Sequence, residues 1–405
     1  MWRYLTAGES HGAQLLGILA GLPAGVPLVP ADIDGYLWRR QGGAGRGARM
    51  RIERDRVAIM AGVWQGLTSG TPLGLTITNR GAIPQAKQPR RTVPRPGHAD
   101  LTGMLKHGFD DANPAIERAS ARETAMRVAL GAAAQTFLRA LGIGVAGHVV
   151  AVGGVSAALH GDDWDRRLAA RDASPLACAD AAAEAEMLAR IDEARSRKET
   201  LGGVAEVVAL GVPPGLGSYA QWDRRLGAEL ARALASIPSV KAVAVGDALT
   251  TSAGFGRDAQ DELFWDEGVV RRTNHAGGLE GGITNGASLV LRAFFKPIPT
   301  QRRPLRSVDL ATGSEEECRY IRSDTLVVPA GSVVAEAMVA LTLAGAVVEK
   351  FGGDSLADTR AAFAAYLARI PWHQPELPEA LRAASAAPAD AGGPAPDGAA
   401  STEEE

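Results

Sequence analysis

The sequence predicts an α+β fold. Expected strands and helices interleave along the 405 residues, but without the even strand–helix repeat of a doubly wound parallel sheet. Glycine is abundant, with 48 residues, and only 5% of the residues are aromatic, so we expect short elements joined by tight turns. Several loops can then converge on one site.

The strands are predicted by short runs of apolar and β-branched residues. Leu75 and Ile77 alternate with threonines, which is typical of a strand with one buried face, and the apolar run 15–20 ends at a glycine-containing turn over 21–25. The predicted strands, in chain order, are 15–20, 51–60, 73–78, 203–210 and 288–295.

The helices are predicted by apolar residues that recur at helical spacing. Pro30 is placed to open the first of them, because proline is tolerated in the first helical turn. The predicted helices, in chain order, are 32–40, 120–141, 179–196, 223–235 and 332–351.

The helix over 120–141 has a distinctive start. Ser120, followed three residues later by Glu123, forms a capping-box pattern, so Ser120 is predicted to be the N-cap. Such a helix would direct free N–H groups outward, with Arg118 and Arg122 close by. This pattern predicts a phosphate or carboxylate site, although a capped surface helix with solvated arginines also fits the segment.

Overall charge and cysteine content narrow the class of protein. The formal net charge is −3, so no global field favours nucleic acid or an acidic membrane surface, and any anion site must be local. Cys178 and Cys318 lack partners at metal-ligand spacing, so we expect no metal site and a reducing, cytoplasmic location. The apolar stretch 337–348 is too short to span a bilayer, and no signal-peptide core is seen, so a soluble protein is expected.

Two histidines stand beside glycines. His11 is flanked by Gly12 and by the Gly8-Glu9-Ser10 segment, and His98 follows a Pro-Gly turn with Asp100 placed to orient its imidazole. Either can be a structural residue. Either can also act as a proton donor or acceptor in a site where the backbone approaches a ligand.

The segment 39–51 combines glycines with many arginines. Its Gly43-Ala44-Gly45 stretch follows a predicted helix rather than a strand, which excludes the dinucleotide-fold fingerprint. The arginines could form an RNA-contacting arm or a clamp for a small molecule with several negative charges. The slightly acidic net charge and the few aromatic residues weigh against RNA.

Three later segments add possible ligand contacts. The glycine-rich loop 274–286 is expected to pack its backbone against a flat or phosphorylated group, and the segment from Lys296 to Thr300 offers a cation and a hydroxyl. Arg322 and Asp324 lie at an element boundary, where a surface ion pair is the simplest interpretation.

Taken together, these motifs resemble the chorismate synthase family. The seven matching segments occur in the family's order and span about residues 1–366: they are 8–12, 39–51, 95–100, 117–124, 277–286, 296–300 and 322–324. The resemblance implies a single catalytic domain over 1–383 with a β-α-β sandwich core. Residues 384–405, mostly Ala, Pro, Gly and acidic residues, are predicted from their composition to be a disordered tail. The resemblance also implies a homotetramer, in place of the two or three domains that length alone suggests.

The resemblance further implies a reaction. The family converts 5-enolpyruvylshikimate 3-phosphate to chorismate and phosphate by anti-1,4-elimination, the last step of the shikimate pathway, with reduced FMN and without net redox change. His11 would be the acid near the departing phosphate, His98 would stabilise the N1 side of the reduced flavin, and Asp324 would assist flavin N5 in removing the C6 proton. Another FMN enzyme acting on an anionic substrate remains an alternative.

Further residues are carried over by motif position. The substrate would be bound by Arg40, Arg46, Arg49, Arg95, Arg122 and Arg322. The flavin would be bound by Arg118, Ala119, Ser120, Pro238, Ser239, Gly281, Lys296, Pro297, Ile298, Pro299, Thr300 and Arg322, with Pro238 and Ser239 contributed by a neighbouring subunit. Arg40 and Arg46 match positions linked to NADPH, a candidate reductant.

Overall fold

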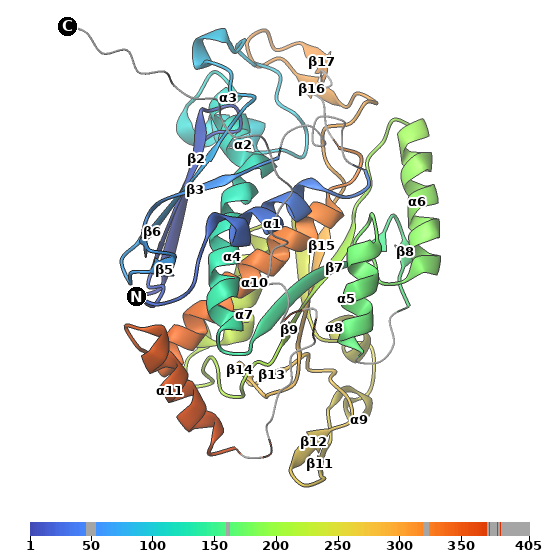
Figure 1. Ribbon diagram of the computed structural model, residues 1–405. Helices are drawn as coiled ribbons and strands as arrows, with labels where there is room; N and C mark the ends of the chain where they lie inside the picture. Colours follow the sequence, from blue (N-terminus) through green and yellow to red (C-terminus); the bar gives the residue numbers. More distant parts are fainter. Residues whose placement is uncertain are drawn as a thin grey trace, which may run out of the picture.

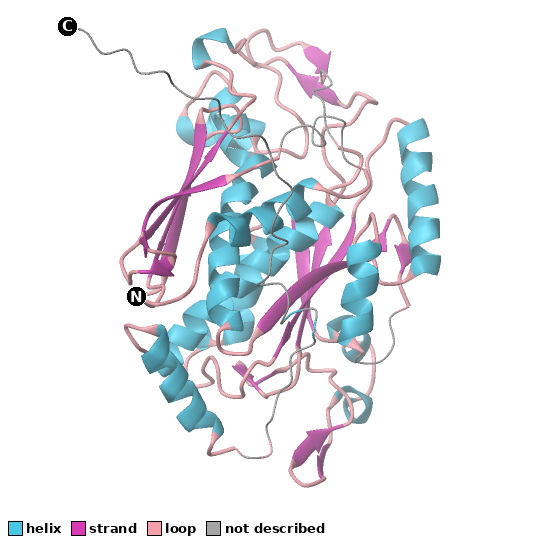
Figure 2. Cartoon of the chain, viewed as in Figure 1, coloured by secondary structure: helices cyan, strands magenta, loops and turns pink. Residues whose placement is uncertain are grey.

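The computed structural model describes residues 1–45, 54–158, 163–318 and 324–370, together with Trp372, Glu379 and Leu381. Two antiparallel sheets lie on opposite sides of a central pair of helices, α4 (Thr124–Arg139) and α10 (Val328–Phe351) (Figures 1 and 2). The molecule is therefore an α+β protein with a β-α-β sandwich core, as predicted.

The first sheet has one buried and one exposed face. In β2, alternate residues are buried, so that Leu15 and Leu19 pack toward α4 while Leu16 and Ile18 face outward. All neighbouring strands are antiparallel. The sheet order is β1 (Arg3–Ala7), β2 (Gln14–Ala20), β6 (Leu73–Thr78) and β3 (Val57–Ala61).

The second sheet is mostly buried. Its central strands, β7 and β9, pack on α10, and α5 (Trp164–Ala173) and α6 (Ala181–Ser196) lie beyond the sheet on the side away from the first sheet (Figure 1). The sheet order is β10 (Val240–Val245), β15 (Leu289–Phe295), β9 (Gly203–Leu210), β7 (Gly144–Val152) and β8 (Val155–Ser156), all antiparallel.

The layers approach closely at glycines. A Cβ atom at Gly131 of α4 would lie 2.4 Å from the Ala337 Cβ of α10, and one at Gly147 of β7 would lie 2.4 Å from the Ser332 oxygen of α10. Only glycine allows such contacts, which bring α10 against both α4 and the second sheet.

The remaining elements surround this core. The longer helices are α1 (Pro30–Gln41), α2 (Asp100–His107), α3 (Asn113–Ala119), α7 (Leu226–Ala235) and α11 (Leu356–Leu367), and the short ones are α8 (Ala248–Thr251) and α9 (Gly256–Ala259). Short 3-10 turns are η2 (Gln85–Lys87), η3 (Ala121–Glu123) and η4 (Trp222–Arg224). Small hairpins pair β4 (Val63–Trp64) with β5 (Leu67–Thr68), β11 (Leu263–Trp265) with β12 (Val269–Arg271), β13 (Leu279–Glu280) with β14 (Ile283–Thr284), and β16 (Arg306–Val308) with β17 (Glu315–Glu317).

The strand predicted over 51–60 is observed only from Val57 onward, so the prediction is wrong for residues 54–56. Residues 51–53 lie outside the described residues, and β3 begins only at Val57. The reason is a contact with α1: the Trp38 Nε1 donates to the Asp55 oxygen at 2.9 Å, and the Arg54 guanidinium lies 5.0 Å from the centre of the Trp38 ring. This segment is held against a helix instead of a neighbouring strand.

The helix predicted over 120–141 begins later than expected. Ser120 caps η3, where its Oγ accepts from the Arg122 N–H at 3.3 Å, and α4 starts at Thr124. Glu123 does not complete a capping box with Ser120, because its Oε1 accepts from Thr6 Oγ1 at 3.0 Å and from Arg127 Nε at 2.8 Å. Contacts with β1 and within α4 therefore replace the predicted cap.

The helix predicted over 332–351 extends forward to Val328. With 24 residues, α10 is long and apolar enough to cross a membrane by length and composition, contrary to the expectation drawn from 337–348. However, 83% of its apolar window is buried inside the protein. A largely apolar helix that is buried between α4 and the second sheet is the expected centre of a large core.

Candidate functional site

His11 is held by a carboxylate that sequence reasoning did not assign to it. Oε2 of Glu117, on α3, accepts from the His11 backbone N–H at 2.7 Å, and its Oε1 lies 2.8 Å from His11 Nδ1. Glu117 is buried, whereas the His11 side chain is 40% exposed. The carboxylate fixes the ring at Nδ1, so Nε2 is the nitrogen directed to exchange a proton with a ligand.

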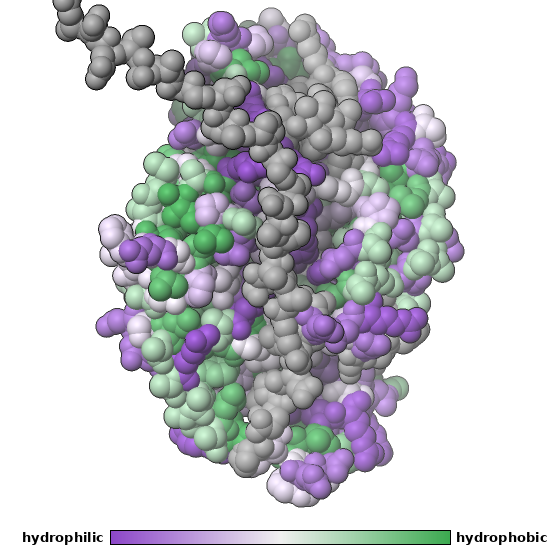
Figure 3. Space-filling view, viewed as in Figure 1, coloured by the Kyte–Doolittle hydropathy of each residue, from purple (hydrophilic) through white to green (hydrophobic). Residues whose placement is uncertain are grey.

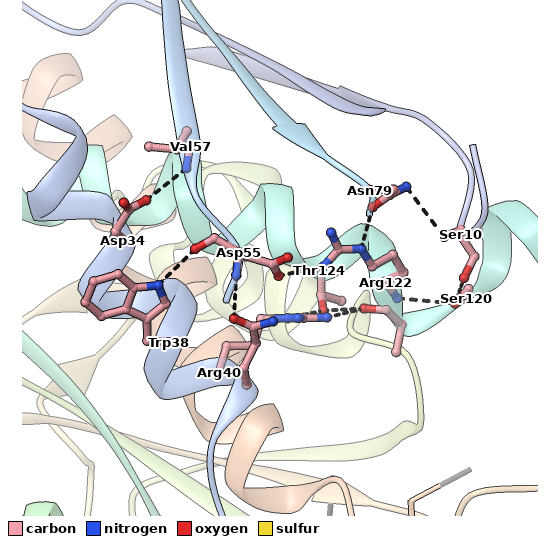
Figure 4. A network of polar contacts seen from close by, with 12 residues as sticks. Ser10, Asp34, Trp38, Arg40, Asp55, Val57, Asn79, Ser120, Arg122 and Thr124 are labelled. Atoms are coloured by element: carbon pink, nitrogen blue, oxygen red, sulfur yellow. Dashed lines mark hydrogen bonds and ion pairs between the residues drawn. The ribbon is translucent and has the colours of Figure 1, made fainter. Parts of the chain in front are cut away.

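Arg122 links three segments around His11. Its Nε donates to Asn79 Oδ1 at 2.8 Å, and its Nη1 lies 2.5 Å from Asp55 Oδ2 (Figure 4). The Asn79 amide in turn donates to the Gly12 oxygen at 2.8 Å. The guanidinium is thus fixed from both sides, which orients it for bidentate recognition of an anion.

Arg40 lies beside this network at the end of α1. Its Nε donates to Thr124 Oγ1 at 3.0 Å and its Nη2 donates to the Ala121 oxygen at 2.7 Å, so it bridges α1 to the start of α4 (Figure 4). The side chain is 5% exposed. Holding a buried cation so close to Arg122 is costly unless an anion or acidic side chains offset it.

These residues open onto one cleft of about 520 Å³. Such a volume suits a small molecule. Among the described residues, the cleft is lined by five arginines, namely Arg40, Arg54, Arg56, Arg80 and Arg122, and by two aspartates, Asp55 and Asp324. His11, Ser10 and Asn79 complete its polar wall. The excess of guanidinium groups favours a ligand with several negative charges.

His98 belongs to a second group, centred on Asp100 at the start of α2. Asp100 is fully buried and accepts from Arg95 Nε at 2.8 Å and from Arg95 Nη2 at 3.0 Å, and it also contacts His98 Nδ1. Burial alone would raise the pKa of Asp100, but hydrogen bonds from His98 and Arg95 outweigh it and hold that pKa well below its usual value. Asp100 therefore orients the imidazole, as predicted.

The segment from Lys296 to Thr300 joins this second group. Lys296 Nζ donates to the Gly97 oxygen at 2.5 Å, and Arg95 Nη1 donates to Thr300 Oγ1 at 3.3 Å. The Lys296 N–H donates to the Ser239 oxygen at 2.9 Å, and Ser239 has φ of 73°, a strained value for a residue other than glycine. Sequence segments about 200 residues apart are thus brought together.

We expect Asp100→Asn to lower the free energy of unfolding by about 2–3 kcal/mol near neutral pH, because Arg95 and His98 lose a charged, buried partner. The folded-state pKa of Asp100 is depressed, so its contribution is complete above the unfolded-state pKa and is lost as the pH falls toward the folded-state value. Urea denaturation should give the same difference between the two proteins at about pH 7 and about pH 5, and a smaller one at about pH 3.5. A difference that grew in acid would contradict this account.

Other predicted site residues are placed differently. Arg118 donates to the Thr6 and Gly8 oxygens, so it holds the end of β1, and Ala119 is the last residue of α3. Ser120 Oγ donates to Ser10 Oγ at 3.1 Å, beside the cleft. Gly281 lies in the β13–β14 turn, and Figure 1 places this hairpin at the opposite end of the molecule from α2 and α3. Arg46, Arg49 and Arg322 lie outside the described residues.

Comparison with known proteins identifies the family. Residues 2–348 match the family model described as chorismate synthase. The chain belongs to the chorismate synthase family. It is 49% identical over 391 residues to the chorismate synthase of Paenarthrobacter aurescens, covering 92% of this chain and 98% of that protein. It is 50% identical over 397 residues to the chorismate synthase of Beutenbergia cavernae, covering 92% and 100%.

A solved structure supports the same assignment. A structure titled "Crystal Structure of Chorismate Synthase" matches with a TM-score of 0.75 at 37% identity, over 91% of this chain and 98% of that one. The chorismate synthase family and the α+β fold predicted from the sequence are thereby confirmed, and the RNA-binding alternative is set aside.

Proposed function

We propose that the protein catalyses the anti-1,4-elimination of phosphate from 5-enolpyruvylshikimate 3-phosphate to give chorismate, as a carbon–oxygen lyase of the shikimate pathway. The observation that supports this most directly is the cleft in which His11, Arg40, Arg122 and Asp324 meet. The substrate carries two carboxylates and a phosphate, and the arginines of the cleft suit these groups.

The chain's own residues would handle the two ends of the elimination. His11, held at Nδ1 by Glu117, would give a proton from Nε2 to the departing phosphate. Asp324, in the same cleft, would assist removal of the proton from C6. The electron pair of the C–H bond at C6 forms a new double bond, the existing double bond shifts, and the C–O bond breaks with its electrons on phosphate, so that a conjugated diene results.

Reduced FMN is the proposed cofactor. When bound, it would supply transient electron density that eases loss of the allylic phosphate. The second group of residues has the chemical types that such a molecule needs. Lys296 and Thr300 would hold its phosphate, and His98 would face the anionic side of its ring. The backbone at Ser239 lies beside Lys296. NADPH is proposed as a reductant, with Arg40 and Arg46 as its candidate contacts.

The reaction can be tested under anaerobic conditions with chemically reduced FMN and 5-enolpyruvylshikimate 3-phosphate. We expect chorismate and phosphate to form in equal amounts while the reduced flavin is not consumed. Stoichiometric flavin oxidation would instead favour the alternative, an FMN oxidoreductase acting on an anionic substrate. Replacing reduced FMN by NADPH plus FMN shows whether the chain reduces its own flavin.

We also propose that the protein is a homotetramer, with a second copy covering the outer face of the first sheet. On this face Leu5 and Ile18 are paired across β1 and β2 and are 57% and 51% exposed, and Met60 of β3 is 67% exposed. Figure 3 shows hydrophobic side chains gathered on the flank where this sheet lies. A monomer rarely leaves so many large apolar side chains together in water.

Ile18→Lys is expected to convert the assembly to a smaller species, because a charge would be buried in the contact between copies. Light scattering coupled to gel filtration measures the mass. Phe255→Lys, at the N-cap of α9, where Phe255 is 83% exposed, is the matched control and should leave the mass unchanged. A wild-type mass in Ile18→Lys would show that this face is not an interface.

A further inference from the structure

One buried carboxylate joins four elements of the core. Glu336 of α10 is 1% exposed, and its Oε1 accepts from Arg39 Nη1 at 3.0 Å and from Gln135 Nε2 at 2.9 Å. Its Oε2 accepts from Arg39 Nη2 at 2.9 Å and from the Gly147 N–H at 2.8 Å. These four hydrogen bonds tie α10 to α1, α4 and β7.

Stability alone is a weak reason for such a pair. A buried ion pair can often be replaced by apolar residues of similar size with little loss of stability, because its attraction is offset by desolvation. Two apolar side chains, however, cannot fix the relative orientation of two helices as a bidentate ion pair can. The bidentate contact between the Arg39 guanidinium and both oxygens of Glu336 fixes the rotation and the axial position of α1 against α10.

The end of α1 that this pair fixes leads directly into the cleft. Arg40 follows Arg39 and contacts the start of α4 through Thr124 and Ala121. Beyond α1, a Cβ at Gly45 would lie 2.8 Å from Leu326 Cβ, and the Thr325 N–H donates to the Gly45 oxygen at 3.0 Å. The segment that follows α1 is therefore packed at Gly45 against the residues that follow Asp324.

We propose that Glu336 is a positioning residue: through Arg39 it sets the end of α1 and so aligns Arg40 with Asp324 across the cleft. Neither Glu336 nor Arg39 lines the cleft, so the effect passes through the backbone of α1. Arg39, although part of the arginine-rich segment, is thereby assigned to the scaffold and not to the ligand. This proposal rests on the proposed function, because it takes the molecule bound in the cleft to be the phosphorylated substrate.

The double variant Arg39→Met/Glu336→Met removes the bidentate contact without leaving one charge of the pair buried alone. Its urea midpoint should still fall, because Gln135 Nε2 and the Gly147 N–H lose their acceptor. Its KM and its substrate dissociation constant, measured by calorimetry without flavin, should both rise about tenfold, while kcat stays within about threefold, since Arg40 contributes mainly uniform binding. A wild-type KM in a folded double variant would overturn the proposal.

A control and a milder variant keep the test decisive. Glu206→Gln breaks a comparable ion pair in the second sheet, where Glu206 of β9 accepts from Arg292 Nε at 2.7 Å. This variant should lower stability and leave KM unchanged.

If the double variant does not fold, Arg39→Lys keeps the positive charge but cannot make the bidentate contact with Glu336, and KM should rise about threefold. An unchanged KM there would equally overturn the proposal. A wild-type protein that forms no chorismate would count against the proposed function, and the calorimetric comparison would still test the alignment.

Discussion

Replacing His11 by alanine is expected to lower turnover by about two to four orders of magnitude while the protein folds normally, the usual range for a lost general acid. The imidazole is held at Nδ1 by Glu117, and its exposed part faces the cleft that Arg40 and Arg122 also line. Without it, the departing phosphate would have to take its proton from water. Single-turnover release of phosphate, with reduced FMN and under anaerobic conditions, measures the step directly.

Two variants separate the histidine's chemistry from its structural contacts. His107→Ala removes a histidine of α2 that stacks on Phe109, outside the cleft, and should keep wild-type turnover. Glu117→Gln keeps the shape of the side chain but replaces one of the two carboxylate oxygens that hold His11 by an NH₂ group, so the ring loses its fixed orientation and turnover should fall about tenfold or more. Near-full activity in His11→Ala would end its assignment as the acid.

Strands were predictable where short runs of apolar and β-branched residues are bounded by turn-forming residues. The strands predicted over 15–20, 73–78, 203–210 and 288–295 are observed within one residue, as β2, β6, β9 and β15. By contrast, β7 was missed. Its sequence carries glycines and His148 among apolar residues, and its strand character depends on pairing with β8 and β9.

Helix starts were less predictable, because tertiary contacts compete with local capping. Glu123 is suited to a capping box with Ser120, yet it pairs with Thr6 and Arg127. The 3-10 turn η4 likewise delays the helix predicted from 223, which begins at Leu226. Local sequence reports the presence of such a helix better than its first residue.

The sequence motifs of the candidate site could be predicted, but the residues that hydrogen-bond to the site residues could not. Glycine-flanked His11, Arg40 and Arg122 belong to predicted segments that meet in one cleft, but Glu117, Asp55 and Asn79 hold His11 and Arg122 from positions far away in the sequence. A weak signal existed for Asn79, which directly follows a strand with one buried face and precedes Arg80 and a glycine. Only the packing of α3 and β6 around the loop shows which polar residues meet.

Asp324→Asn is expected to leave binding almost intact and to slow proton removal by about a hundredfold or more. Asparagine keeps the shape and much of the hydrogen bonding of aspartate but has no basic oxygen. Asp324 lines the cleft with His11 and Arg122, so the proposed function places its carboxylate near the proton that leaves C6. Binding and chemistry should therefore separate in one variant.

Anaerobic single-turnover experiments can follow the flavin absorbance and phosphate release together. If Asp324 acts in proton removal, substrate and reduced FMN will bind Asp324→Asn at near wild-type concentrations, and phosphate will appear slowly. Asp266→Asn, in the β11–β12 turn, is a matched control and should behave as wild type. Wild-type rates in Asp324→Asn would return the residue to an ordinary ion pair, and loss of flavin binding would make it a ligand of the cofactor instead. The two outcomes can be told apart. In the first, phosphate is released at the wild-type rate; in the second, reduced FMN no longer binds, so the reacting complex does not form.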